Sequence, residues 1–166
     1  MRRLLLFVLL ILGVSIVFTQ FSFSQTRKKE LSSFTQDNCS SIYSFLSRYD
    51  SFNLTTGSGK VTMLRPDYSR FERKGCKVSL SGKLPKDEKS VPNMDQYFKD
   101  NGWEPILIYM ADGHGSGSMG FFKQGKYGDG TFCLKSHDYN VSEGEEPSYL
   151  NIDVTCVDGY KEVFVK

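Results

Sequence analysis

A predominantly apolar run over residues 4–18 opens the chain and directly follows two arginines. Polar residues end the run, and the small residues Ser22 and Ser24 come shortly afterwards. A positive start, an apolar stretch of this length and a small-x-small site are together typical of a cleaved secretory signal. We therefore predict a signal peptide over residues 1–24, a mature chain that begins at Gln25, and a secreted or periplasmic location.

An uncleaved membrane anchor is the alternative interpretation of this run. A helix that spans a bilayer needs about 20 apolar residues, and about 17 is the practical minimum. Because the run at 4–18 is shorter, cleavage is favoured, and membrane attachment is expected only if the signal stays uncleaved. The first cysteine is Cys39, so the sequence does not predict lipid attachment next to the run.

Helical spacing marks the first element of the mature chain. One face at this spacing is formed by Cys39, Ile42, Tyr43, Phe45 and Leu46. The spacing predicts a helix from about Gln36 to Tyr49, with Thr35 or Asp37 as its N-cap. Residues 25–34 ahead of this helix are expected to be a flexible lead-in.

Alternation marks the next element. Cys76, Val78 and Leu80 alternate with polar residues, which predicts a half-buried strand with Cys76 on its inner face. The polar, glycine-containing residues 53–60 are expected to be a loop. Residues 61–73 mix apolar and charged side chains and are not assigned.

A second helix is predicted after the charged loop that follows this strand. It runs from about Pro92 to Asn101, with Ser90 as N-cap and Gly102 after its end. Its apolar face is formed by Met94, Tyr97 and Phe98.

From Trp103 onward, short alternating segments are separated by glycine and aspartate, the pattern of a β-meander. The expected strands are Glu104–Met110, Met119–Lys123, Thr131–Ser136, Ser148–Cys156 and Glu162–Val165. The predicted class is α+β, an antiparallel β-meander sheet with one or two helices packed on one face. Residues 35–166 are expected to form a single domain, since their number suits one hydrophobic core.

The charge of the mature chain limits the partners that it attracts. The full chain has a formal net charge of +2, and removal of Arg2 and Arg3 leaves 19 basic and 19 acidic residues. A neutral chain has no field that draws in nucleic acid or anionic lipid. The expected partner is therefore an extracytoplasmic protein or a small ligand, and not nucleic acid.

Four cysteines, an even number in an exported chain, predict two disulfides with three possible connectivities. We favour Cys39–Cys76, because the helix face would pack on the inner strand face. We favour Cys133–Cys156 as well, because the last long strands pair in that register if the acidic loop between them is symmetric. The spacing lacks the close cysteine pairs of structural zinc sites, so no metal or cofactor is predicted.

The segment 111–118 is the most unusual stretch, with three glycines between two apolar strands. Its four candidate binding residues are Asp112, His114, Ser116 and Ser118. Its backbone amides can form an anion nest, Asp112 and His114 can contribute to a metal site, and a serine can be a nucleophile with His114 or His137 as base. The phosphate-loop and G-x-S-x-G patterns are absent. The segment is expected to be a long, flexible hairpin connection that is dispensable for folding.

The stretch from Gly102-Trp103 through Ala111-Asp112-Gly113 to Cys133 resembles small secreted bacterial proteins of uncharacterised function, and this resemblance implies no activity. The run Ser116-Gly117-Ser118 is also similar to the Ser/Gly loop that some periplasmic lysozyme inhibitors insert into their target. This chain has Gly120 and Phe121 where those inhibitors have a tyrosine.

Two function classes follow from these observations. The first is a small, disulfide-stabilised, non-catalytic binding or inhibitor module that uses the segment 111–118. The second is a small secreted hydrolase that uses His114 or His137. We favour the first, because general acid–base catalysis needs titratable partners in contrasting environments, and His137 and Asp138 are expected to point to opposite faces of a strand. If segment 111–118 is not the site, the face that carries Tyr149, Asn151 and Asp153 is the next candidate.

Overall fold

The computed structural model describes residues 25, 29–30, 32–64, 69–87, 90–113, 115–126, 129–140 and 149–160. The predicted signal peptide, His114 and the predicted last strand Glu162–Val165 lie outside these residues. Within the described part of the chain, no helix is both long enough and apolar enough to cross a membrane.

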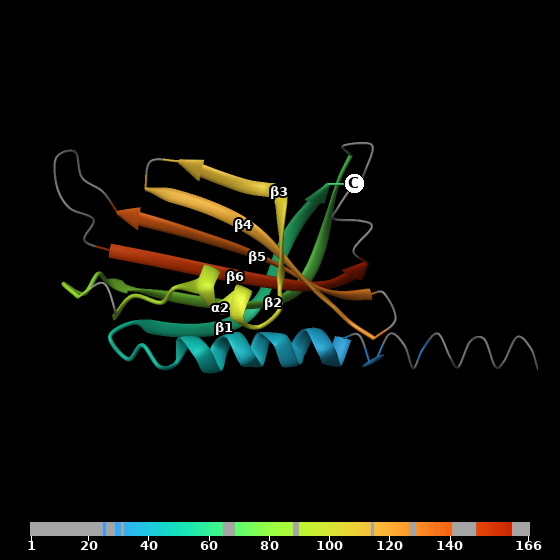
Figure 1. The fold of residues 1–166 in the computed structure, drawn as a ribbon, viewed down its shortest axis with the longest axis horizontal. Coiled ribbons are helices and arrows are strands. Elements are labelled where there is room, and N and C mark those ends of the chain that lie inside the picture. The colour runs from blue at the N-terminus through green and yellow to red at the C-terminus, as the bar shows by residue number, and fades with distance from the viewer. Residues whose placement is uncertain are drawn as a thin grey trace, which may run out of the picture.

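The protein has an α+β fold, as predicted, with one six-stranded antiparallel sheet in the order β1-β2-β6-β5-β4-β3. The strands are β1 (Asn53–Leu64), β2 (Arg70–Lys83), β3 (Glu104–Gly113), β4 (Ser116–Gln124), β5 (Asp129–Asn140) and β6 (Tyr149–Tyr160). Two helices, residues 32–46 and α2 (Met94–Asp100), pack with the same face of the sheet. Figure 1 shows the N-terminal helix running beside β1, while α2 lies over the middle of the sheet.

The expectation of a loop at residues 53–60 is wrong, because these residues form the first two thirds of β1. β1 pairs with β2 along its whole length, from Asn53 opposite Ser81 to Leu64 opposite Arg70. Its polar composition suits this position, because most residues of segment 53–60 are exposed to water. The pairing is made with a distant segment, which local alternation does not reveal.

Both helices differ from the prediction at their ends. In the described part of the chain the first helix occupies residues 29–30 and 32–46, so Thr35 and Asp37 lie inside it and neither is the N-cap. The expected flexible lead-in at residues 25–34 is therefore helical where it is described. Instead, the Oγ1 atoms of Thr35 and Thr131 share a buried hydrogen bond of 2.9 Å. The N-cap of α2 is Asn93 rather than Ser90, and its side chain accepts a hydrogen bond from the backbone N–H of Gln96.

Alternate residues of the central strands pack into two cores on the two faces of the sheet. Under the helices lie Phe121, Cys133, Val154 and Cys156 with Ile42, Leu46 and Phe98. On the opposite face lie Phe122, Phe132 and Val157 with Val61, Met63 and Ile106. The central strands are therefore buried on both faces along part of their length, which explains their high apolar content.

Residues of β1 contribute to the second core because β1 and β2 bend away from β6. Register pairing between β2 and β6 ends at Cys76 and Cys156. A Cβ atom at the next residue, Gly75, would lie 1.9 Å from the carbonyl oxygen of Cys156, so only glycine fits this close approach. Beyond this point β1 and β2 curve upward in Figure 1, and Val61 joins the second core.

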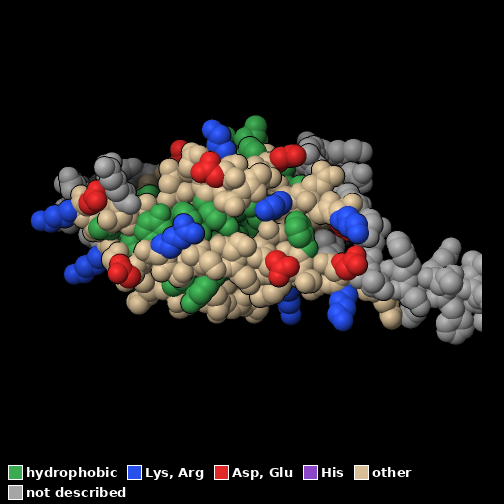
Figure 2. Space-filling model, turned by 60° about the horizontal axis from the view of Figure 1, so that its bottom comes forward, with side chains coloured by type: hydrophobic (Ala, Val, Ile, Leu, Met, Phe, Trp, Pro, Cys, Tyr) green, Lys and Arg blue, Asp and Glu red, His purple; other side chains and the backbone are tan. Residues whose placement is uncertain are grey.

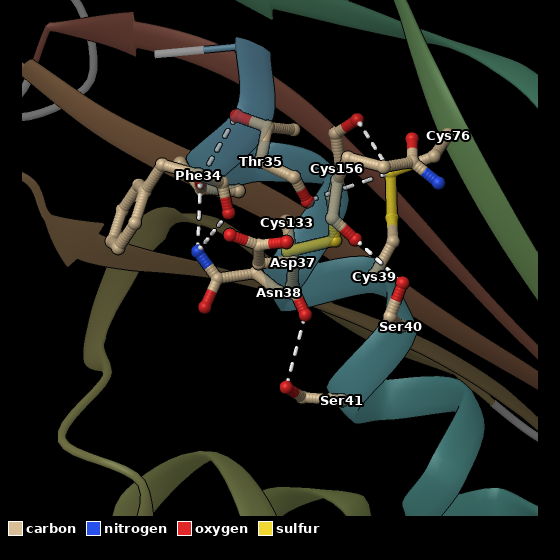
Figure 3. The surroundings of a disulfide bond; sticks show 12 residues. Phe34, Thr35, Asp37, Asn38, Cys39, Ser40, Ser41, Cys76, Cys133 and Cys156 are labelled. Carbon is tan, nitrogen blue, oxygen red and sulfur yellow. Dashed lines mark hydrogen bonds between the residues drawn. A yellow bond between two sulfur atoms is a disulfide. The ribbon is translucent and has the colours of Figure 1, made fainter. Parts of the chain in front are cut away.

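The structure contains the disulfides Cys39–Cys76 and Cys133–Cys156, the connectivity preferred from the sequence. Their Cα atoms are 6.5 Å and 4.0 Å apart, respectively. Cys133 and Cys156 are register partners on β5 and β6, whereas Cys39 reaches Cys76 from the helix above the sheet. Figure 3 shows the two disulfides side by side beneath this helix.

Candidate functional site

The predicted site segment 111–118 is a tight hairpin turn, so the expectation of a long, flexible connection is wrong. β3 continues to Gly113 and β4 begins at Ser116, with Gly113 opposite Ser116. Gly115 has a φ of 78°, a conformation that two-residue hairpin turns require and glycine adopts without strain. The backbone N–H of Tyr139 donates to the carbonyl oxygen of Gly115 at 2.6 Å, which fixes the turn against β5.

The hairpin places its candidate residues on opposite faces of the sheet. Asp112 lies opposite Gly117, and Gly117 lies opposite His137, so Asp112 and His137 share the face that carries the helices. Ser116 and Ser118 are on the other face, because successive residues of a strand alternate. Their position leaves neither serine beside His137, and no serine–histidine dyad forms between these described residues.

The hydroxyl of Ser118 is used structurally. Its Oγ donates a hydrogen bond to the carbonyl oxygen of Tyr109 at 3.2 Å. This bond joins β4 to the middle of β3, where regular strand pairing is interrupted. Ser118 therefore helps to hold the edge of the sheet together, a role that its position in a glycine-rich segment did not suggest.

His137 packs against Gly117 close to the turn, and its pKa is shifted. Its ring lies over Gly117, where an added Cβ would be 2.6 Å from Cε1. Burial lowers the pKa of His137, Lys135 lowers it further, and three carboxylates act in the opposite direction: Asp95, Asp112 and Asp138. The neutral imidazole is thus the form that this site favours.

A pocket of about 500 Å³ opens beside His137, between α2 and strands β5 and β6. Its apolar walls are formed by Leu84, Val91, Met94 and Ile152. Its charged and ring side chains are Asp95 from α2 and Lys135, His137 and Tyr139 from β5, and Asn93, the N-cap of α2, adds an amide. A small pocket with apolar walls and a few polar groups is the usual form of a ligand site.

Lys135 is the residue in this pocket that sequence analysis missed. Only 9% of its side chain is exposed, and its Nζ lies 2.7 Å from Oδ1 of Asp95, whose side chain is 60% exposed. Lys135 stands two residues after Cys133 and two before His137, so its inward position follows from the period of two in β5. That period is the signal that could have found it.

A second unusual surface lies at the middle of β3, which is an edge strand of the sheet. Ile106 lies opposite Gly120 and Ala111 lies opposite Ser118. Between these two pairs β3 has four residues, 107–110, whereas β4 has one, Met119. We call segment 107–110 the β3 bulge. In Figure 1 the yellow ribbon of β3 rises from α2 and turns sharply there before running alongside β4.

The β3 bulge exposes large apolar side chains. Leu107 is 66% exposed and Met110 57%, and Ile108 between them is also exposed. Tyr109 instead turns inward, with its ring centroid 4.7 Å from that of Phe132. The extra residues therefore let one side chain enter the core while its neighbours face water.

A groove of about 760 Å³ runs between the N-terminal helix and strands β1 and β2. Half-buried Cys76 lines this groove together with small hydroxyl side chains, whereas Cys133 and Cys156 are fully buried. On the face shown in Figure 2, basic and acidic side chains are interspersed rather than separated into fields of one sign. The Cys39–Cys76 disulfide therefore has one half-buried cysteine, whereas both cysteines of the other disulfide are buried.

Among the residues that the structure describes, no group of three or more histidine, cysteine, aspartate or glutamate side chains is placed to hold a metal ion. Comparison with protein-family models, with curated proteins and with solved structures gives no match. The candidate sites of this chain are therefore the β3 bulge and the pocket beside Lys135.

Proposed function

We propose that this protein is a secreted or periplasmic, disulfide-stabilised binding module that engages another extracytoplasmic protein through the β3 bulge. The observation that carries the proposal is the apolar exposure of Leu107, Ile108 and Met110 on an edge strand. The only other exposed large apolar residues in the described part of the chain are Tyr43 and Tyr149.

Edge strands of soluble proteins are normally protected, because an open edge pairs readily with other chains. In β3, the charged residues Glu104 and Asp112 lie at the two ends, and the bulge between them carries apolar side chains. A contiguous apolar patch with a polar rim is typical of a protein-interaction surface. An extended partner segment can add along such an edge and place its own apolar side chains on Leu107 and Met110.

A binding role is favoured over the alternative hydrolase by the arrangement of the candidate residues. Ser116 and Ser118 lie on the opposite face of the sheet from His137, so the nucleophile–base contact of a serine hydrolase is not made by these residues. The predicted candidate His114 lies outside the described residues.

The extracytoplasmic location is supported by the two disulfides, since disulfides persist in oxidising compartments and are rare in the cytosol. It agrees with the secretory pattern over residues 1–24 and with the absence of free cysteines among the described residues.

Photo-crosslinking tests the binding function. A photoreactive amino acid is placed at Ile108 of the exported protein, and a matched control carries it at Tyr43, which is 41% exposed on the N-terminal helix. We expect one discrete adduct with another protein from position 108 and none from position 43. The double substitution Leu107→Ser and Met110→Ser should abolish that adduct and leave the melting temperature unchanged, because both side chains are already in water.

Three results would contradict the proposal. They are the absence of an adduct at position 108, an adduct that persists in the double variant, and an adduct that contains only a second copy of this chain.

A further inference from the structure

We propose that the pocket between α2 and strands β5 and β6 binds a small monocarboxylate with an apolar body, and that its carboxylate takes the place of Asp95 on Lys135. This site is separate from the β3 bulge and rests on different observations. We call it the Lys135 pocket. The proposal rests on the buried ammonium group of Lys135, whose partner Asp95 has a mostly exposed side chain.

The charge pair in the Lys135 pocket is asymmetric. Lys135 is buried at the pocket wall and therefore needs an anion close to its ammonium group. Asp95, at the rim of the pocket, supplies that anion, with its Oδ1 2.7 Å from Nζ of Lys135. Because the side chain of Asp95 is mostly exposed, it can return to water at little cost. A ligand carboxylate that enters the pocket offers Lys135 the same charge, so exchange of one carboxylate for the other preserves the pairing.

The apolar walls define the rest of the ligand. Leu84, Val91 and Ile152 come from the loop after β2, the segment before α2, and β6. They line an open pocket of about 500 Å³, within the range of sites for small molecules. An aliphatic chain or an aromatic ring that fills this space is removed from water, which favours binding in proportion to its apolar area.

His137, whose lowered pKa favours the neutral ring, gives the Lys135 pocket a further hydrogen-bonding group without a second positive charge. Its ring faces Tyr139, with the ring centroids 5.4 Å apart, and both side chains line the pocket. Among the described residues that line the pocket, Lys135 is the one cation, and it balances a single negative charge. The pocket should therefore select a monocarboxylate over a dicarboxylate or a phosphate ester.

The test uses octanoate and phenylacetate as probes. Calorimetry measures their affinity for the mature protein, and two-dimensional NMR locates the residues that they contact. We expect at least one of the two acids to bind and to shift the resonances of Lys135 and His137. The uncharged analogues 1-octanol and 2-phenylethanol should bind about tenfold more weakly or worse, since they cannot form a charge-assisted hydrogen bond with Lys135.

Two variants separate a ligand-binding lysine from a structural one. Lys135→Met keeps an apolar stem and should weaken binding of the acid about tenfold or more without weakening binding of the alcohol. Asp95→Asn removes the competing carboxylate and should strengthen binding of the acid several-fold. A merely structural ion pair predicts no gain from the second change.

The matched control is Lys77→Met, because Lys77 also pairs with an aspartate, Asp153 at 2.9 Å, but lies on β2 away from the pocket. This variant should leave binding of the acid unchanged. The proposal is overturned if neither acid binds at millimolar concentration, if acid and alcohol bind equally, or if Asp95→Asn weakens binding. An equal loss in Lys77→Met would also overturn it.

Discussion

Cys76 and Cys156 lie directly opposite each other on the neighbouring strands β2 and β6, yet they are not bonded to each other. Cys156 is instead bonded to Cys133, its register partner on β5. Cys76 is bonded out of the sheet to Cys39 of the N-terminal helix. Three cysteines therefore form one row across the sheet, and the helix decides which neighbours pair. Register partners in an antiparallel sheet are close enough for a disulfide.

This row predicts disulfide exchange when the helix cysteine is removed. In Cys39→Ser, the free thiolate of Cys76 can attack Sγ of Cys156, form the Cys76–Cys156 bond and release Cys133 as a thiolate. We expect peptide mapping without reduction to find Cys76–Cys156 beside Cys133–Cys156. If Cys133–Cys156 is the sole linkage after prolonged incubation at pH 8, the two strands do not allow the exchange.

Each native disulfide should contribute similarly to stability. The bonded cysteines are separated by 37 and 23 residues, and the loop-entropy relation gives about 3–4 kcal/mol for loops of these lengths. Paired serine substitutions at either disulfide should therefore lower the free energy of unfolding by this amount in urea titrations. A change below about 1 kcal/mol would mean that the unfolded chain is already restricted there.

The bend of β1 and β2 can be tested with two glycines. In Gly75→Ala, the new methyl group would collide with the carbonyl oxygen of Cys156, and we expect a loss of about 1–3 kcal/mol or more. Gly57→Ala is the matched control, because a Cβ there meets nothing within 4 Å. The control should be neutral or stabilising by up to about 1 kcal/mol. Equal effects of the two changes would show that the close approach at Gly75 is absent.

His137 should make the stability of the protein depend on pH. Its pKa is lowered in the folded state, chiefly by burial, from an ordinary value of about 6.5. Below pH 6.5 the unfolded chain therefore binds a proton before the folded chain does, and the free energy of unfolding falls until the pH reaches the lowered pKa. Above pH 6.5 both states are neutral and this contribution is complete.

The measurement is a series of urea titrations between pH 5 and 8. His137→Gln should flatten the decline just below pH 6.5, because glutamine does not titrate in this range. If His137→Gln keeps the full slope, other groups carry the dependence.

The mature chain is expected to begin at Gln25. Intact-mass measurement of the exported protein should give the mass of residues 25–166 with both disulfides formed, since signal cleavage and oxidation follow export. A mass that retains residues 1–24 would instead indicate an anchor.

Local patterns were sufficient for the part of the fold whose periodicity is strong. The alternation around Cys76 and around Cys156 identified two central strands, and the helical spacing of Cys39 and Ile42 identified the first helix. The helix and strand assignments placed Cys39 against Cys76, and a symmetric loop between the last long strands placed Cys133 opposite Cys156. The structure contains both of these disulfides. This worked because side chains repeat every two residues in a strand and about every 3.6 in a helix, so burial is visible in the sequence.

The remaining features were decided by tertiary structure. Segment 53–60 is polar and becomes a strand only because β2 offers it a partner from Ser81 onward. The candidate sites also depend on contacts between distant segments. Lys135 pairs with Asp95, which is 40 residues away in the chain. Asp112 lies on the same face as His137 only because of the register of β3 on β4 and of β4 on β5. Local periodicity thus indicates which strands and helices have a buried face, whereas contacts between distant segments set which charges meet and which edge stays open.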